Sequence, residues 1–208
     1  MNKYVAVIIV LLVAVVAMSL WVAYSPKPAE TAVDNIMTRT SIRAYQDKPV
    51  EQERVEALLR AAMAAPTARN MQPWKFIVVT DKELLQQIAD TINTMTMAAH
   101  APLAIVVCGD LNEALPGEGN GYWVQDASAA TENLLLAAHA MGLGAVWCGV
   151  YPKSERVAFI SRLLELPASI VPLNVIPIGY PAESPNPKDK WKPEKIHLNK
   201  WGNIWQKP

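Results

Sequence analysis

GLGAVWCG, residues 142–149, joins a long apolar helix pattern to a short strand pattern. The preceding residues, Gln125 to Met141, are apolar on nearly every side of a helix, which is typical of a central helix or one in a subunit interface. Gly142 and Gly144 end that helix, and the apolar residues from Ala145 to Cys148 predict a strand. We therefore expect one buried helix beside a sheet.

Helix and strand patterns alternate along the remaining chain. We expect helices at about 51–66, 81–97 and 154–166, and strands at 74–79, 103–108 and 173–178. The strand patterns are short β-branched or aromatic runs, and the helix patterns carry apolar residues at helical spacing. This alternation predicts an α+β fold with one mixed sheet, whose strand order cannot be read from the pattern.

Length and charge limit the kind of protein. The chain has 208 residues, of which 51% are apolar, and a formal net charge of +0. A chain of this length builds one good core but not two ordinary domains once the N-terminal segment is set aside. No stretch is strongly basic, so the charge pattern does not predict binding to nucleic acid or acidic lipid. Small molecules and a second protein subunit are the expected partners.

The N-terminal segment differs from the rest of the chain. Residues 4–24 are apolar apart from Ser19, and a run of that length can span a bilayer, which needs ~20 apolar residues. Trp21 and Tyr24 suit the headgroup level, and Lys3 favours an orientation with the catalytic body outside the cytoplasm. An uncleaved anchor is favoured over a cleaved signal peptide, whose apolar region would be shorter. We therefore expect a membrane-anchored protein with an anchor or signal segment at 1–25, a linker at 26–33 and one domain at 34–208.

Cys108 and Cys148 both lie inside apolar strand patterns. Such cysteines are usually core residues, although a disulfide between neighbouring strands stays open for an exported domain. The three histidines lie far apart, and no His, Cys, Asp or Glu cluster has metal-ligand spacing, so we expect no metal site. The sequence also lacks the nucleophile-elbow, Walker and dinucleotide-binding motifs.

Three clusters of polar and small residues stand out: RTSIR at 39–43, PTARNMQPW at 66–74 and GLGAVWCGVYP at 142–152. None contains an obvious nucleophile. Guanidinium groups bind phosphate in a fork, and amides pair with the edge of a heteroaromatic ring. The basic and amide side chains therefore suit a planar, anionic cofactor that itself carries the chemistry.

These three motifs, in this order and at these separations, resemble those of the nitroreductase family. The resemblance extends from about Asp34 to the C-terminus. It implies an α+β sandwich in which helices flank a mixed central sheet, assembled as an interleaved homodimer with two FMN sites built from both chains. Trp191, Trp201 and Trp205 need burial in an otherwise polar tail, and a tail that embraces a partner subunit would provide it.

The resemblance also implies roles for individual residues. Arg39 and Ser41 would hold the FMN phosphate and ribityl chain, and Arg43 would lie near the N1/O2 edge of the flavin. Backbone N–H groups at Gly149 and Val150 would lie near flavin N5. The full set expected at the cofactor is Arg39, Thr40, Ser41, Arg43, Pro66, Thr67, Ala68, Asn70, Gln72, Gly149, Val150, Lys188 and Lys190. No side chain is expected to act as a catalytic acid or base, because solvent can supply protons.

Several positions depart from the family pattern. Thr40 stands where a basic residue is usual, Thr67 and Ala68 where serines are common, and Lys188 and Lys190 where an arginine often appears. A lysine is a point charge without the guanidinium fork, so these lysines would bind phosphate less tightly.

The family implies an oxidoreductase with a ping-pong cycle, in which NAD(P)H reduces FMN and leaves before a nitroaromatic, quinone or similar acceptor takes the electrons. Two alternatives keep the fold. A reductive dehalogenase would use residues 109–123 as a substrate lid, although this segment has no clear clamp for a substrate carboxylate. A non-catalytic, membrane-anchored module would bind flavin or a partner without turnover, because a shared fold does not guarantee a shared function.

Overall fold

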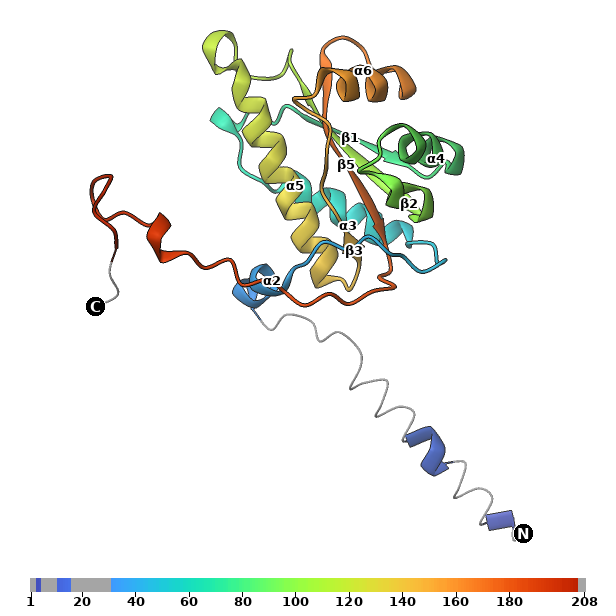
Figure 1. Ribbon diagram of the computed structural model, residues 1–208. Helices are drawn as coiled ribbons and strands as arrows, with labels where there is room; N and C mark the ends of the chain where they lie inside the picture. Colours follow the sequence, from blue (N-terminus) through green and yellow to red (C-terminus); the bar gives the residue numbers. More distant parts are fainter. Residues whose placement is uncertain (1–2, 5–10, 16–30, 206–208) are drawn as a thin grey trace.

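The computed structural model describes residues 3–4, 11–15 and 31–205, and Figure 1 shows the arrangement of the elements. The main helices are α2 (Ala32–Thr38), α3 (Gln52–Met63), α4 (Lys82–Thr91), α5 (Trp123–Ala140) and α6 (Ser154–Leu163). The strands are β1 (Trp74–Val79), β2 (Leu103–Asp110), β3 (Gly144–Ala145), β4 (Cys148–Gly149) and β5 (Ile170–Gly179). Short 3₁₀ turns are η1 (Ala68–Asn70), η2 (Thr96–His100), η3 (Gly117–Tyr122) and η4 (Pro193–Lys195).

The strands form one sheet in the order β1-β2-β5-β3, with β4 also paired to β5. The α+β class is confirmed. Every pairing between described strands is antiparallel, so the parallel pair that makes a sheet mixed is not found within the described part of one chain. For β1 and β2 the reason is the connection, because α4 and η2 return the chain to the end of the sheet where β1 stops, and Val79 pairs with Ala104.

β3 and β4 are two parts of one edge strand. Ala145 pairs with Ile178 and Cys148 pairs with Val175, so both parts keep the same register on β5. The continued register places Val146 opposite Pro177. Proline has no N–H to give to a ladder, which explains why the pairing is interrupted at this point.

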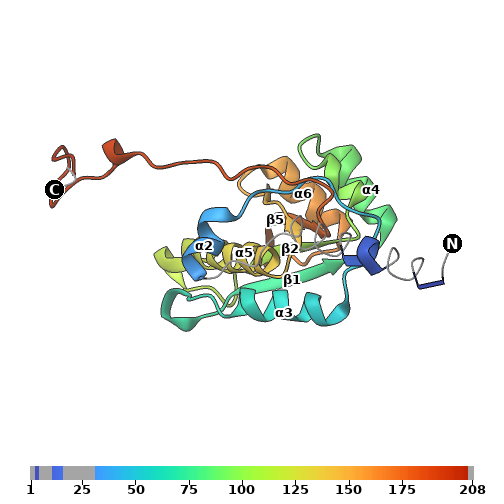
Figure 2. The ribbon, with the colours of Figure 1, turned by 90° about the horizontal axis from the view of Figure 1, so that it is seen from below.

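The sheet separates two apolar cores. Along β2, Leu103, Ile105 and Val107 pack into the core that contains α3 and α5, and the even-numbered residues from 104 to 108 pack into the core that contains α4 and α6. Figure 2 shows α3 on one side of the sheet and α4 and α6 on the other. α5 is buried along its length, from Trp123 to Ala138, which confirms the expected central helix.

Cys108 and Cys148 are buried and unpaired, as expected of core residues. They lie on β2 and β4, which are separated by β5. Two strand spacings amount to ~9.6 Å, whereas a disulfide needs Cα atoms within ~7 Å. Burial raises the pKa of the Cys108 thiol to about 12 and that of Cys148 to about 11, so both thiols stay protonated at neutral pH.

The expectation of a membrane-anchored protein is wrong for the chain as the structure describes it. No helix among the described residues is long and apolar enough to cross a bilayer. Most of the apolar run 4–24, and the linker as far as residue 30, lie outside the described residues. The division into 1–25, 26–33 and 34–208 stays a prediction.

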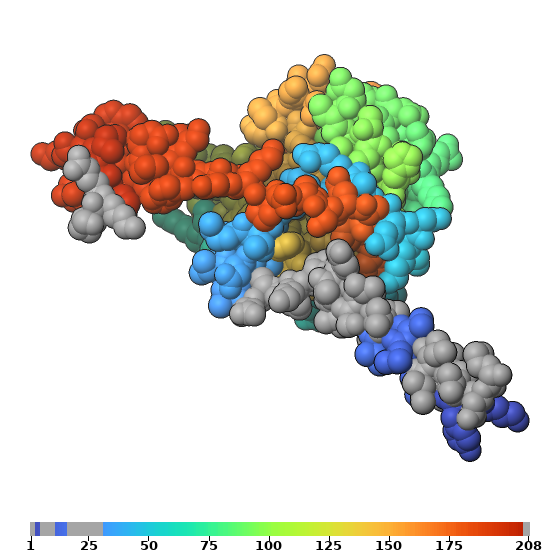
Figure 3. Space-filling view, turned by 60° about the horizontal axis from the view of Figure 1, so that its bottom comes forward, coloured from blue at the N-terminus to red at the C-terminus, as the bar shows by residue number. Residues whose placement is uncertain are grey.

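The C-terminal tail, residues 182–205, leads away from the rest of the molecule, as Figures 1 and 2 show. Its first residues cross the surface beside the segment 39–46, where Ala182 N–H donates to Ala44 O at 2.9 Å and Gln46 N–H to Tyr180 O at 2.8 Å (Figure 3). Further along, the rings of Trp191 and Trp205 meet edge to face at 6.2 Å. The tail therefore carries aromatic side chains outside both cores.

Close packing at Gly144 holds the segment 39–46 against the edge strand. A Cβ at this position would come within 2.5 Å of Ile42 Cγ2. Gly144→Ala should therefore lower the free energy of unfolding by ~1–3 kcal/mol, measured by urea denaturation, because Ile42 must move. Gly121→Ala is the matched control, since beyond its two chain neighbours no heavy atom in the described part of the chain lies within 4 Å of its added Cβ. Equal losses in the two variants would contradict the packing argument.

Candidate functional site

The Gly149 peptide points out of the sheet. Gly149 pairs with Asn174, and the next residue, Val150, donates its N–H to Leu173 O at 3.0 Å. Hydrogen bonds alternate along an antiparallel pair, so the N–H and C=O of Gly149 face away from β5. The Gly149 N–H is therefore available to a ligand at the sheet edge. The Val150 N–H, also expected to face the cofactor, is engaged within the sheet.

Space lies over Gly149 on the side of the sheet that faces α5. Apart from the two neighbours of Gly149 in the chain, no heavy atom of the described residues lies within 4 Å of the position that a Cβ would take there. Trp147 and Tyr151 follow the same alternation on either side and are 37% and 41% exposed. The ring of Tyr151 meets that of Trp123, in the first turn of α5, at 5.0 Å and 70°. A flat ring could approach the backbone closely at Gly149, because a glycine has no side chain in the way.

Asn174, directly opposite Gly149, is a fully buried amide. Its Nδ2 donates to Thr131 Oγ1 at 3.0 Å, and Thr131 Oγ1 donates to Ala127 O at 2.8 Å. Its Oδ1 has no hydrogen-bond partner among the described residues. Because buried polar atoms are normally paired, this oxygen is a candidate acceptor for a donor that enters beside Gly149.

The motif at 39–43 lies along the same edge. Ile42 N–H donates to Ala145 O at 3.1 Å, which adds the segment to the outer side of β3. Arg39 Nε lies 3.4 Å from Glu132 Oε1 on α5, and its side chain is only 18% exposed. Arg43 is exposed, and its backbone N–H donates to Glu183 Oε1. The structure thus brings the whole motif to the edge that contains Gly149, with Thr40 and Ser41 half-buried between the two arginines.

The charge of Arg39 acts on His139 in the last turn of α5. The pKa of His139 is lowered, first by burial and then by the nearby guanidinium of Arg39. The His139 Nε2 atom lies 3.0 Å from Thr38 Oγ1. A neutral imidazole therefore suits this position, and the guanidinium of Arg39 is paired with Glu132 on the same helix as His139.

The loop 66–72 is held in an unusual backbone conformation. Arg69, Asn70 and Gln72 have φ values of 49°, 58° and 54°, a left-handed region that side chains other than glycine seldom adopt. Gln72 Nε2 donates to Asn70 Oδ1 at 2.8 Å, and the Gln72 N–H donates to Thr67 Oγ1 at 3.1 Å. Such strain persists only where the surroundings enforce it, and it concentrates at functional sites.

Asp126 is one group that holds this loop. Its Oδ1 accepts the Ala68 N–H at 2.8 Å, and the residue is 5% exposed. Asp126 lies one turn after Trp123, which contacts Tyr151. The first turn of α5 therefore supports both the loop and the edge near Gly149. Pro66 is exposed and Thr67 and Ala68 are half-buried at the start of this loop.

The late basic pair is not brought to the edge within one chain. Lys188 and Lys190 are exposed on the tail that leads away from the body (Figure 1). No described hydrogen bond or ion pair joins either lysine to the edge strand. Any role for them at the candidate site needs the tail to meet another surface.

The segment 109–123, considered as a substrate lid, folds back onto the body. Lys75 Nζ lies 2.7 Å from both carboxylate oxygens of Glu113, and Asn120 Nδ2 donates to Leu111 O at 3.1 Å. Trp123 closes the segment in a buried position against Gly109, where a Cβ would come within 2.3 Å of its ring. These contacts describe an anchored turn more than an open lid.

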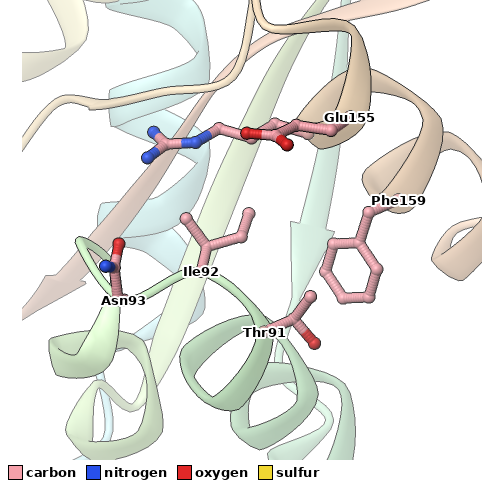
Figure 4. Close-up of a pocket in the computed structure, with 6 residues that line it drawn as sticks. Thr91, Ile92, Asn93, Glu155 and Phe159 are labelled. Carbon is pink, nitrogen blue, oxygen red and sulfur yellow. The ribbon is translucent and has the colours of Figure 1, made fainter.

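A cavity of about 340 Å³ lies between the end of α4 and the start of α6. Figure 4 shows Thr91, Ile92 and Asn93 on one side and Glu155 and Phe159 on the other. Arg156 also lines it, and Arg156 Nη1 donates to Gly149 O at 2.8 Å. The Arg156 side chain therefore contacts both this cavity and the candidate site.

Asp126 and Arg156 were not found from the sequence. An acid beside Trp123, Val124 and Ala127 is a visible signal for Asp126, because burying a carboxylate is costly without a partner. Arg156 looks like an ordinary solvated residue of an amphipathic helix, and the sequence contains no signal for its contact with Gly149. Among the described residues no group of three His, Cys, Asp or Glu side chains could hold a metal ion.

Comparison with known proteins identifies the family. The family model described as Nitroreductase family matches residues 36–96 and 93–180. The chain belongs to the nitroreductase family and is an oxidoreductase of that family. A protein provisionally named NADH dehydrogenase/NAD(P)H nitroreductase, from Methanothermobacter thermautotrophicus, is 48% identical over 170 residues, covering 81% of this chain and 87% of the relative.

Two further proteins with the same provisional name are similar. One from Archaeoglobus fulgidus is 44% identical over 175 residues, covering 83% of this chain and 99% of the relative. The crystal structure of the other, from Parabacteroides distasonis, superposes with a TM-score of 0.78 at 45% identity and covers 82% of this chain and 98% of that one. The fold predicted from the motifs is therefore confirmed.

Removing the Asp126 carboxylate should loosen the loop 66–72. Asp126→Ala leaves the Ala68 N–H without its acceptor and should cost ~1–3 kcal/mol of stability. Hydrogen exchange of the Ala68 amide should accelerate with it. Asp126→Asn is the control, because its amide oxygen can still accept the bond and exchange should stay close to the wild-type rate. Equal protection of Ala68 in the alanine variant and the wild type would contradict this role.

Proposed function

We propose that this protein is an FMN-dependent oxidoreductase that passes electrons from NAD(P)H to a nitroaromatic, quinone or similar small acceptor by a ping-pong cycle. The observation that carries the proposal is the outward Gly149 N–H, which lies on the same sheet edge as Arg39, Ser41 and Arg43. Relatives support the cofactor: an FMN reductase [NAD(P)H] from Bacillus subtilis is 28% identical over 180 residues. An FMN-dependent nitroreductase from Clostridium difficile has a TM-score of 0.73 at 31% identity.

The residues at the edge fit a flavin nucleotide. Arg39 offers a guanidinium fork for the phosphate, and Ser41 offers a hydroxyl for the ribityl chain. The Gly149 N–H can donate to a ring nitrogen, and the space beside it admits a flat ring. Asn174 Oδ1 offers an acceptor to a ring N–H. This donor and acceptor set is what an anionic, heteroaromatic cofactor requires.

When bound, FMN supplies the hydride and electron transfer chemistry. The chain itself binds and orients the ring, and the charges of Arg39 and Arg43 favour a negatively charged ligand at the edge. The aromatic side chains Trp147 and Tyr151 offer flat surfaces to a planar substrate. No side chain is assigned as a proton donor, since solvent reaches the exposed edge.

We propose that two copies of the chain assemble around this site. Trp201 on the tail is 89% exposed and Trp191 is 63% exposed, and such aromatic rings are normally buried. Helix α2 also exposes Val33, Ile36 and Met37, which together form an apolar surface. A second copy that covers both surfaces would bury them, and it would give Lys188 and Lys190 on the tail a phosphate to bind. In such an assembly, the loop 66–72 of one copy would line the flavin site that it shares with the other copy.

Arg39→Ala should weaken retention of FMN by at least ~10-fold, because a charge-assisted bond to phosphate contributes ~1.5–3 kcal/mol. The measurement is the dissociation constant for FMN, obtained from quenching of flavin fluorescence. Arg60→Ala is the matched control: Arg60 is exposed on α3 and pairs with Glu56. An unchanged dissociation constant in Arg39→Ala would refute the phosphate role.

The ping-pong cycle has its own kinetic test. With NADH or NADPH and a quinone varied together, double-reciprocal plots should give parallel lines, because the nucleotide leaves before the acceptor binds. Intersecting lines would show that both substrates bind together and would exclude the cycle while leaving the flavin assignment intact.

A further inference from the structure

We infer that Arg156 is a positioning residue of the flavin site: it fixes the Gly149 peptide and adds a positive charge at the sheet edge, so that the bound cofactor is easier to reduce. The inference rests on the proposed function and deepens it. Nothing in the motif pattern pointed to Arg156, which lies in the first turn of α6.

The contact with Gly149 is the geometric basis. Arg156 Nη1 donates to Gly149 O at 2.8 Å, and the contact is partly buried. Because the Gly149 peptide turns outward from β5, the carbonyl has no strand to pair with on that side. The Arg156 guanidinium donates to this carbonyl, as the backbone N–H of a neighbouring strand would in a wider sheet. The N–H that would meet the flavin is therefore attached to a residue whose carbonyl is held by a cation.

Two cations approach this edge from different elements. Arg43 lies on the segment 39–46. Arg156 lies on α6, which packs on the side of the sheet that also carries α4. Burial raises the pKa of Cys148, and the guanidiniums of Arg43 and Arg156 both act against that rise, which places both charges near residue 148. Among the described residues neither side chain forms an ion pair with a carboxylate, although Glu183 accepts the backbone N–H of Arg43. The charges of Arg43 and Arg156 therefore lack a paired carboxylate among the described residues, whereas Arg39 on the same edge is paired with Glu132.

The cavity between α4 and α6 makes Arg156 suitable for a test. Arg156 lines this space of about 340 Å³ together with Ile92 and Phe159 (Figure 4). A methionine of similar length can occupy the same space without displacing packed atoms. The substitution Arg156→Met therefore removes the charge and the hydrogen bond while leaving both cores intact.

A positive charge stabilises the reduced cofactor more than the oxidised one, because reduction adds negative charge to the ring. Its removal should weaken binding of reduced FMN relative to oxidised FMN. For Arg156→Met we expect this ratio to change by about 10-fold, which lowers the two-electron midpoint potential by about 30 mV. Arg156→Lys keeps the charge but loses the fork, so its potential should fall by less than half as much.

The experiment is a redox titration of FMN bound to the full-length protein against a reference dye. Arg162→Met is the matched control, because Arg162 is exposed on the same helix α6 and should leave the potential unchanged. A wild-type potential in Arg156→Met would overturn the inference while the flavin assignment stands. If Arg156→Met fails to retain FMN, the neutral variant Arg156→Gln is titrated instead. A lowered potential in Arg156→Gln would support the inference, and a wild-type potential would overturn it. A wild-type protein that binds no FMN would overturn the proposed function itself.

Discussion

The alternating hydrogen bonds between β5 and the edge strand β3–β4 fix which peptides of that strand point away from the sheet at the candidate site. Even-numbered residues of the edge strand, such as Val150, bond to β5, and odd-numbered residues turn their peptides outward. The outward Ala145 O accepts a hydrogen bond from the Ile42 N–H, which brings the arginine motif to the edge. Gly149 O accepts a hydrogen bond from Arg156 Nη1, and the Gly149 N–H also faces outward. A shift of one residue in register would reverse all three contacts.

Helix α5 supplies the second constraint, because it supports polar groups from three separate segments. Asp126 holds the loop 66–72, Thr131 holds Asn174, and Glu132 pairs with Arg39. These polar residues lie on a mostly apolar helix whose buried residues run from Trp123 to Ala138. A single rigid helix thus sets the spacing between the loop, the sheet and the arginine motif.

The sequence predicted what depends on local pattern. The strand expected at 74–79 has those bounds, and the helix expected at 125–141 is α5 at 123–140, because apolar spacing is a local property. The arginine motif and Gly149 lie along the same sheet edge, and their roles at a cofactor stay predictions. Strand order, the antiparallel pairings and the contact of Arg156 with Gly149 depend on how distant segments meet, which a single sequence does not record. The membrane prediction, which rested on the apolar run and its flanking Lys3, Trp21 and Tyr24, was wrong, since no helix among the described residues is long and apolar enough to cross a bilayer.

We propose that the outward edge at Gly149 holds a flavin that nicotinamide nucleotides reduce. The most direct test of this proposal is the absorbance spectrum of the purified full-length protein, supplied with FMN and recorded before and after anaerobic addition of NADH or NADPH. We predict flavin bands that remain with the protein after gel filtration and that bleach on addition of nucleotide. A protein that takes up no FMN would contradict the account. A retained flavin that neither nucleotide bleaches would instead indicate a non-catalytic flavin-binding module.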